Sequence, residues 1–179
     1  MPHLNIEIKA RCTEHDRIRE LLKARQARFV GEDHQVDTYF RTSHGRLKLR
    51  EGSIERSLIY YERPDQHGPK ASNVTLYKPG PGAALKQILT QVLGVLVVVE
   101  KRREIYFIDH VKFHLDRVDH LGTFVEIEAI DDEGTIGEAR LHQQCAYYLD
   151  LFKIAEEDLV PVSYSDLLLQ DRTNVKRKT

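Results

Sequence analysis

The stretch Asn5-Ile6-Glu7-Ile8-Lys9-Ala10-Arg11 alternates strictly between polar and apolar residues. A β-strand turns successive side chains to opposite faces, so this stretch predicts a strand whose apolar face carries Ile6, Ile8 and Ala10. On the other face acids and bases are interleaved, in the order Asn5, Glu7, Lys9, Arg11. The same style returns in later segments, such as Arg46-Leu47-Lys48-Leu49-Arg50. This repetition indicates a charged face that lines an internal space.

The composition is that of a globular protein. The chain has 179 residues, of which 41% are hydrophobic and 31% charged, enough for one domain with a sizeable core. The formal net charge of −1 argues against a general nucleic-acid or membrane binder. No apolar run reaches the ~18 residues that a membrane-spanning helix needs, and residues 1–20 show no signal-peptide pattern. Cys12 and Cys145 lack metal-ligand spacing and fit reduced thiols, so we expect a cytoplasmic location.

Periodicity and turn residues divide the chain into strands and a few helices. A helix is predicted over Glu14–Phe29, with Thr13 as its N-cap and Gly31 after its end. Further helical segments are predicted over 83–93 and 138–151. After the first strand, we expect strands over residues 35–40, 46–50, 57–63, 70–77, 95–108 (one long strand or two short ones), 112–118 and 123–130. We expect residues 1–170 to form one domain and the basic segment 171–179 to be a disordered tail.

These segments predict an α+β fold with about eight mostly antiparallel strands, closed into a barrel, because closure removes the sheet edges. In a barrel, alternate residues face inward. If the apolar faces pack outward against helices, the polar faces must line a tunnel. For any single strand a solvated sheet face explains the alternation equally well. That explanation weakens once four strands show the pattern, with acids and bases segregated into different strands.

Strand parity gathers many charged side chains on the predicted inner face. Burying them without a ligand would destabilise the barrel, whereas a polyanion together with a divalent cation would make them compatible. Arginine and lysine suit phosphate oxygens, and carboxylates suit Mg²⁺ or Mn²⁺. We therefore expect two sets of residues. The phosphate-binding set is Lys9, Arg11, Arg46, Lys48, Arg50, Lys101, Arg103 and Lys112, and the metal-binding set is Glu7, Asp116, Glu126 and Glu128.

Several of these segments resemble the motifs of a known protein family. The first strand resembles the Glu-x-Glu-x-Lys signature of the CYTH superfamily, the triphosphate tunnel metalloenzymes, which include class IV adenylyl cyclases, thiamine triphosphatases and inorganic triphosphatases. Further matching segments follow in the family's order: Asp37-Thr38-Tyr39-Phe40, Leu47-Lys48-Leu49-Arg50, Lys70-Ala71-Ser72-Asn73, residues 100–106, Leu115-Asp116-Arg117-Val118 and residues 121–128. The segment 163–168 resembles a common ending of class IV cyclase-like members. The resemblance covers about residues 3–169.

The resemblance implies an enzyme that uses Mg²⁺ or Mn²⁺ and acts on a small-molecule triphosphate, ATP or tripolyphosphate. We assign catalytic roles to Asp116, as a metal ligand or as the group that orients the nucleophile, and to Lys101. Asn5 stands where the family signature has its first glutamate. An asparagine can lend a carbonyl oxygen to a metal but brings no charge. A homodimer is left open.

Three functions stay open at this point. In a cyclase, the ribose 3′-hydroxyl of ATP attacks the α-phosphorus and pyrophosphate leaves, giving cyclic AMP. In a triphosphatase, water attacks the terminal phosphorus. Both reactions need cations for the phosphates and a metal for the developing charge. The third function is a binding protein for polyphosphate or nucleotide, with catalysis lost through Asn5. A lipocalin-like carrier fits less well, because its lumen should be apolar.

Overall fold

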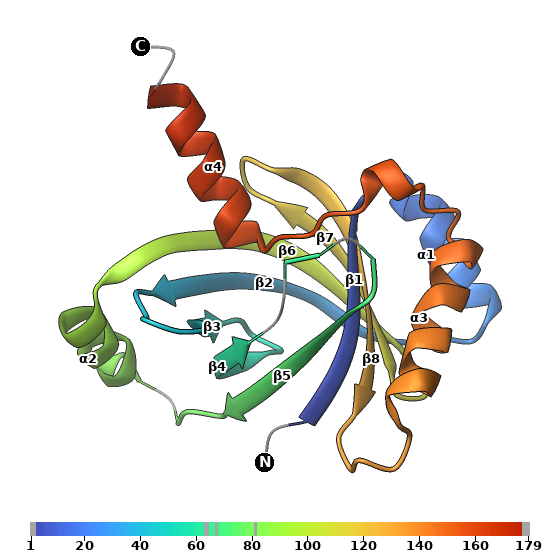
Figure 1. The fold of residues 1–179 in the computed structure, drawn as a ribbon, viewed down its shortest axis with the longest axis horizontal. Coiled ribbons are helices and arrows are strands. Elements are labelled where there is room, and N and C mark those ends of the chain that lie inside the picture. Colours follow the sequence, from blue (N-terminus) through green and yellow to red (C-terminus); the bar gives the residue numbers. More distant parts are fainter. Residues whose placement is uncertain (1–2, 63–64, 67, 81, 177–179) are drawn as a thin grey trace.

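Eight antiparallel strands close into a barrel in the order β1-β5-β4-β3-β2-β6-β7-β8 (Figure 1), which confirms the predicted fold class. The structure is a computed structural model that describes residues 3–62, 65–66, 68–80 and 82–176. The strands are β1 His3–Arg11, β2 Arg28–Phe40, β3 Arg46–Glu51, β4 Arg56–Glu62, β5 Lys70–Tyr77, β6 Val95–Ile108, β7 Val111–Val118 and β8 Gly122–Asp131.

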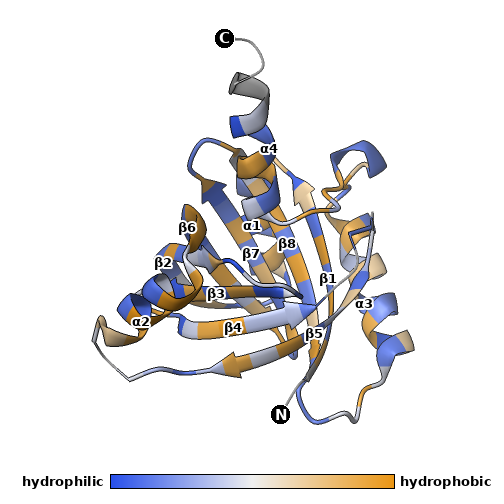
Figure 2. Cartoon of the chain, turned by 60° about the vertical axis from the view of Figure 1, so that its left-hand side comes forward, coloured by the Kyte–Doolittle hydropathy of each residue, from blue (hydrophilic) through white to orange (hydrophobic). Residues whose placement is uncertain are grey.

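The register between β1 and β8 shows how the sequence pattern builds two different faces. Ile8 lies opposite Ile127, and the adjacent pair is Lys9 opposite Glu126. Because the side-chain period of a strand is two, the apolar pairs point outward and the charged pairs inward. Figure 2 shows the resulting alternation of hydrophilic and hydrophobic bands along β1, β7 and β8.

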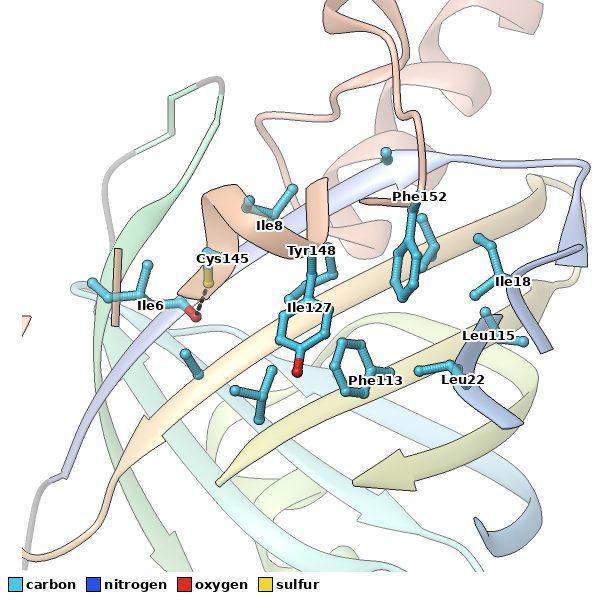
Figure 3. Packing of buried hydrophobic residues seen from close by; sticks show 14 of the residues in the cluster. Ile6, Ile8, Ile18, Leu22, Phe113, Leu115, Ile127, Cys145, Tyr148 and Phe152 are labelled. Carbon is cyan, nitrogen blue, oxygen red and sulfur yellow. Dashed lines mark hydrogen bonds between the residues drawn. The ribbon is translucent and has the colours of Figure 1, made fainter. Parts of the chain in front are cut away.

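The main apolar core lies outside the barrel, between β1, β7 and β8 and the two helices α1 (His15–Ala24) and α3 (Glu138–Leu151). Figure 3 shows Phe113 at its centre, with ring centroids 4.6 Å from Tyr148 and 5.7 Å from Phe152. The Cys145 thiol donates to the carbonyl of Ile6 at 3.2 Å. Each fully buried large side chain contributes ~1.5–3 kcal/mol, so this core fixes the outer face of the strands that supply the inner charges.

The first helix is shorter than predicted. It ends at Ala24, because Gln26 adopts a left-handed conformation (φ 57°) that turns the chain, and β2 begins at Arg28. Phe29, predicted on the apolar face of the helix, lies in β2, and its ring packs 4.8 Å from that of Tyr106. The N-cap is Glu14 rather than Thr13, and Gly31 lies within β2 at an irregularity of its pairing with β6.

Helix α4 (Tyr164–Lys176) crosses the predicted boundary between domain and tail. Its first turn is capped reciprocally, because the Ser163 hydroxyl accepts from the backbone N–H of Asp166 and the Asp166 carboxylate accepts from the backbone N–H of Ser163. Leu168 packs in a cluster with Val97 and Val99 of β6. This capping and packing fix the start of a helix that continues past residue 171, where the sequence predicts a disordered tail. Residues 177–179 lie outside the described residues.

Two shorter elements complete the described chain. Helix α2 (Ala84–Leu93) joins β5 to β6, and the 3₁₀ turn η1 (Glu156–Asp158) precedes α4. Within the described residues, no helix is both long and apolar enough to cross a membrane.

Candidate functional site

A cavity of about 660 Å³ occupies the interior of the barrel, and all eight strands contribute to its wall. Most of the charged residues selected from the sequence line it, and they face one another across the lumen. They are Glu7, Lys9, Lys48, Arg50, Lys101, Arg103, Lys112, Glu126 and Glu128. The structure therefore brings these nine residues into one site. Asp116 lies directly behind this wall, whereas Arg11 and Arg46 do not line the cavity.

Asp37, on β2, organises the cations of one side of the cavity. Its carboxylate accepts two bonds from the Arg50 guanidinium, both at 2.9 Å, one from Lys101 at 2.8 Å and one from Lys48 at 3.1 Å. Burial alone would raise the pKa of Asp37, but these three cations hold it well below its usual range. Arg50 has a second carboxylate beside it, that of Glu55 at 2.9 Å, so two anions face three cations and this side of the lumen keeps surplus positive charge.

Lys101 is the most deeply buried of these cations, with 1% of its surface exposed. Burial lowers its pKa to about 7, and the neighbouring Asp37 opposes that shift. Its charge therefore depends on pH near neutrality. A phosphate placed beside it would favour the ammonium form.

A second buried network joins β6, β7 and β8. Arg103 donates to both oxygens of Asp116, at 2.7 and 2.5 Å, and to Glu126 at 2.7 Å. Asp116 also accepts from the Tyr164 hydroxyl at 2.8 Å. Burial and the Arg103 charge lower the pKa of His114, whose Nδ1 lies 3.1 Å from Glu126. The carboxylates of Asp116 and Glu126 are therefore already engaged by protein cations and donors.

The third part of the site lies between β1 and β8. Glu7 and Glu128 are directly opposite in the register, and both line the cavity. The side-chain nitrogen of Asn5 donates to Glu128 at 2.5 Å. Asn5 is 3% exposed, and its carbonyl oxygen accepts no hydrogen bond from any described residue. Two carboxylates and one unused amide oxygen are thus gathered on one wall.

The two remaining basic residues of the predicted set have other partners. Arg11 lies at the end of β1, is exposed, donates to the carbonyl of Leu121 and stacks over Phe124 at 5.0 Å. Arg46 pairs with Asp65 and with Asp166 at the start of α4. Strand parity predicts that Arg11 and Arg46 point inward. Both lie at strand ends, where a long side chain can extend out of the lumen.

Sequence reasoning missed several residues of the site. Asp37 lies in a segment quoted for the resemblance, yet no role was given to it. Glu55 lies in the connection between β3 and β4 and bonds to Arg50 at 2.9 Å and to Lys112. Tyr164 lines the cavity, and the Lys9 ammonium lies 4.1 Å above its ring. Parity could have indicated Asp37, because it is two residues before the inward-facing Tyr39. Glu55 and Tyr164 could be recognised only from the folded structure.

A family model for the CYTH domain matches residues 3–154. The chain belongs to the CYTH family. Members of the family are generally enzymes, cyclases or triphosphatases, and use divalent metals. The search of curated proteins found no match.

Solved structures resemble this CYTH chain over nearly its whole length. A protein from Pyrococcus horikoshii is 27% identical with a TM-score of 0.74, and the match covers 91% of this chain and 98% of that one. A candidate adenylate cyclase from Vibrio parahaemolyticus is 21% identical with a TM-score of 0.73, covering 94% and 99%. A candidate adenylyl cyclase from Hippeastrum, described as having a dominant triphosphatase activity, is 14% identical with a TM-score of 0.61, covering 93% and 94%. The last two show the shared fold alone.

The Asp37 network makes a prediction about stability. Among the described residues, Asp37 supplies the one carboxylate bonded to Lys48 and Lys101, so Asp37→Asn leaves their charges uncompensated. Breaking a buried ion pair in this way costs ~3–5 kcal/mol. We expect the free energy of unfolding, measured in urea, to fall by that amount. Tripolyphosphate should raise the melting temperature of Asp37→Asn by more than it raises that of the wild type. Asp150→Asn, at an exposed surface pair, is the control and should be close to neutral. A near-neutral Asp37→Asn would contradict the assignment.

The lowered pKa of Lys101 leads to a prediction about proton uptake on ligand binding. At pH 8 much of Lys101 is neutral in the empty protein, so binding a polyanion beside it should take up about one proton. Lys101→Arg keeps its charge at this pH and should take up fewer protons. Calorimetric titration with tripolyphosphate in two buffers of different ionisation enthalpy measures the difference, and proton release by the ligand is common to both proteins. Equal proton uptake by the two proteins would show that Lys101 does not respond to the ligand.

Proposed function

We propose that this CYTH protein is a divalent-metal-dependent enzyme that binds a triphosphate in the barrel and breaks one of its phosphoanhydride bonds. The observation that carries the proposal is the arrangement around Asp37, where one carboxylate bonds Lys48, Arg50 and Lys101. Such a surplus of buried cations is costly in an empty protein and is offset by a polyanion. Lys9 and Lys112 add two further ammonium groups on other parts of the wall.

The metal would be held by Glu7, Glu128 and the amide oxygen of Asn5. The unused Asn5 oxygen beside Glu128 fits such a role, because hard divalent cations prefer carboxylate and carbonyl oxygens. This set is narrower than the one expected from the sequence, since Glu126 and Asp116 are bonded to Arg103. Within the described residues, no three His, Cys, Asp or Glu side chains converge as a metal site. When bound, the cation would supply charge neutralisation and polarisation at the phosphates.

Apolar side chains in the same cavity favour an organic triphosphate such as ATP. Ile54, Leu76, Phe107 and Ile130 line the cavity together with the charged groups. Tripolyphosphate alone would leave such surface without a partner, whereas the base and ribose of a nucleotide could cover it. The cavity therefore offers separate surfaces for the phosphates and for the organic part of the substrate.

Hydrolysis is the reaction that the site supports better. Phosphoryl transfer to water depends mostly on positioning and charge neutralisation, and the cation-lined wall provides both. Cyclisation also requires a group to take the proton of the 3′-hydroxyl. Asp116, the candidate for that role, is fully buried and bonded to Arg103 and Tyr164. The cyclase reaction remains the second candidate, because the sequence motifs resemble those of class IV cyclases.

The test of the function is an assay of purified protein with ATP or tripolyphosphate and Mg²⁺ or Mn²⁺, in which phosphate, pyrophosphate and cyclic AMP are measured. Lys48 is held less tightly than Arg103, so Lys48→Ala should remove a phosphate contact while the protein still folds. We expect kcat/KM to fall by roughly 10²-fold, as for the loss of one charge-stabilising donor. Lys153→Ala, at an exposed position, is the control. Binding without any product would identify a binding protein, and cyclic AMP as the main product would favour the cyclase.

Asn5 provides a test of the metal set. Asn5→Glu replaces the bond to Glu128 with a repulsion between two carboxylates, so the metal-free protein should lose ~1–3 kcal/mol of stability. A divalent cation would relieve that repulsion, so Mn²⁺ should raise the melting temperature of Asn5→Glu more than that of the wild type. Asn73→Glu adds the same charge at an exposed position of β5 and should show no such gain. An equal response to Mn²⁺ in the wild type and Asn5→Glu would remove Asn5 from the metal set.

A further inference from the structure

Glu55 places a carboxylate inside the cavity from a connection between strands. It lies between β3 and β4, and its side chain lines the cavity with 20% of its surface exposed. It accepts from Arg50 Nη1 at 2.9 Å, from the ammonium of Lys112 and from Gln35 Nε2 at 2.9 Å. Its two cationic partners come from different parts of the wall, β3 and β7, which β2 and β6 separate. Both belong to the group of cations that we propose for phosphate binding.

The backbone of this connection is fixed by a second acid. Asp33, which is fully buried on β2, accepts from the N–H groups of Ser53, Ile54 and Glu55 at 2.7, 3.0 and 2.9 Å. It also accepts from the Ser53 hydroxyl at 2.9 Å. Gly52 lies so close that a Cβ there would be 2.4 Å from an Asp33 oxygen. The backbone at Glu55 is thus held, so the carboxylate could leave the cations only by rotation of the side chain.

The Glu55 carboxylate is an anion at neutral pH. Burial is the largest single influence and raises its pKa, but the combined charges of Arg50, Lys112 and their neighbours outweigh it, so the net shift is strongly downward. A carboxylate and a phosphate offer the same chemistry to a guanidinium or an ammonium group, namely oxygen acceptors with negative charge. Glu55 therefore presents to Arg50 and Lys112 what a phosphate would present.

We propose that Glu55 is an internal competitor for the phosphate site, which a triphosphate must displace from Arg50 and Lys112 in order to bind. The inference rests on the proposed function of the same cavity. Glu55 stabilises the empty barrel by neutralising two cations. The same contact weakens substrate binding and helps the product to leave, because the carboxylate returns to the cations as the phosphates depart. A carboxylate that only supported the fold, away from the phosphates, would leave ligand binding unchanged.

Glu55→Gln tests this role, because glutamine keeps the size of the side chain and removes its charge. We expect its dissociation constant for tripolyphosphate, measured by calorimetry with Mg²⁺ present, to be about tenfold lower than that of the wild type, since a charged hydrogen bond no longer has to be broken. The melting temperature without ligand should fall. Glu55→Asp, whose shorter side chain cannot span both cations equally well, should lie between the two. Glu100→Gln, an exposed residue of β6, makes the same change in net charge away from the cavity and should bind like the wild type.

The outcomes separate this inference from the function on which it rests. If the wild type binds tripolyphosphate and Glu55→Gln binds equally or more weakly, Glu55 is not a competitor and the proposal is overturned, while the triphosphate site stands. If only Glu55→Gln binds, the competition is stronger than expected and the proposal holds. If neither protein binds, the phosphate site itself is wrong and both proposals fall.

Discussion

The structure depends on the mutual neutralisation of charges inside a closed barrel. Taking an ion out of water costs several kcal/mol even after relaxation, so inward-facing cations are tolerated only beside anions in good geometry. Asp37 and Asp116 meet this need in two different ways. Asp37 collects three cations around one carboxylate, whereas Asp116 shares Arg103 with Glu126. The first network leaves surplus positive charge in the lumen and the second leaves little.

The two networks therefore give the two parts of the cavity wall different roles in ligand binding. Lys48 and Lys101 gain when another anion arrives, because they share the carboxylate of Asp37 with Arg50. Arg103 and Arg50 are each bonded to two carboxylates and gain less. Stability and binding are therefore linked in the same groups. A polyanion that enters the lumen supplies the charge that the fold lacks, and a ligand that binds only the folded state stabilises it by mass action.

The closed barrel and its charged lumen could be predicted from the sequence, because strand periodicity indicates directly which face a side chain occupies. The β1 pattern placed Glu7 and Lys9 inward, and the structure has both in the cavity. The same reasoning failed where the signal was of another kind. Phe29 fitted a helical period, but the turn at Gln26 ended the helix before it. Parity shows the face of a side chain and not its partner, so it could not indicate that Asp116 is bonded to Arg103 and Tyr164. Glu55 gave no periodic signal, since its direction is set by bonds from its connection to Asp33, some twenty residues earlier in the chain.

The partners of each cation indicate how far it can serve a ligand. Lys9 lies 3.3 Å from Glu126, 3.4 Å from the carbonyl of Val162 and above the ring of Tyr164, so it also holds the segment that leads into α4. Lys70 makes a similar link to the carbonyl of Pro161 at 2.8 Å. Such cations are bound to groups that the fold fixes in place, and removing them disturbs structure and binding together. Lys112 is different, because its partner Glu55 is the group that we propose a triphosphate displaces. A substrate can therefore bind with the smallest loss of folding stability to cations that share one carboxylate, such as Lys48 and Lys101, and to Lys112, whose partner Glu55 it would displace.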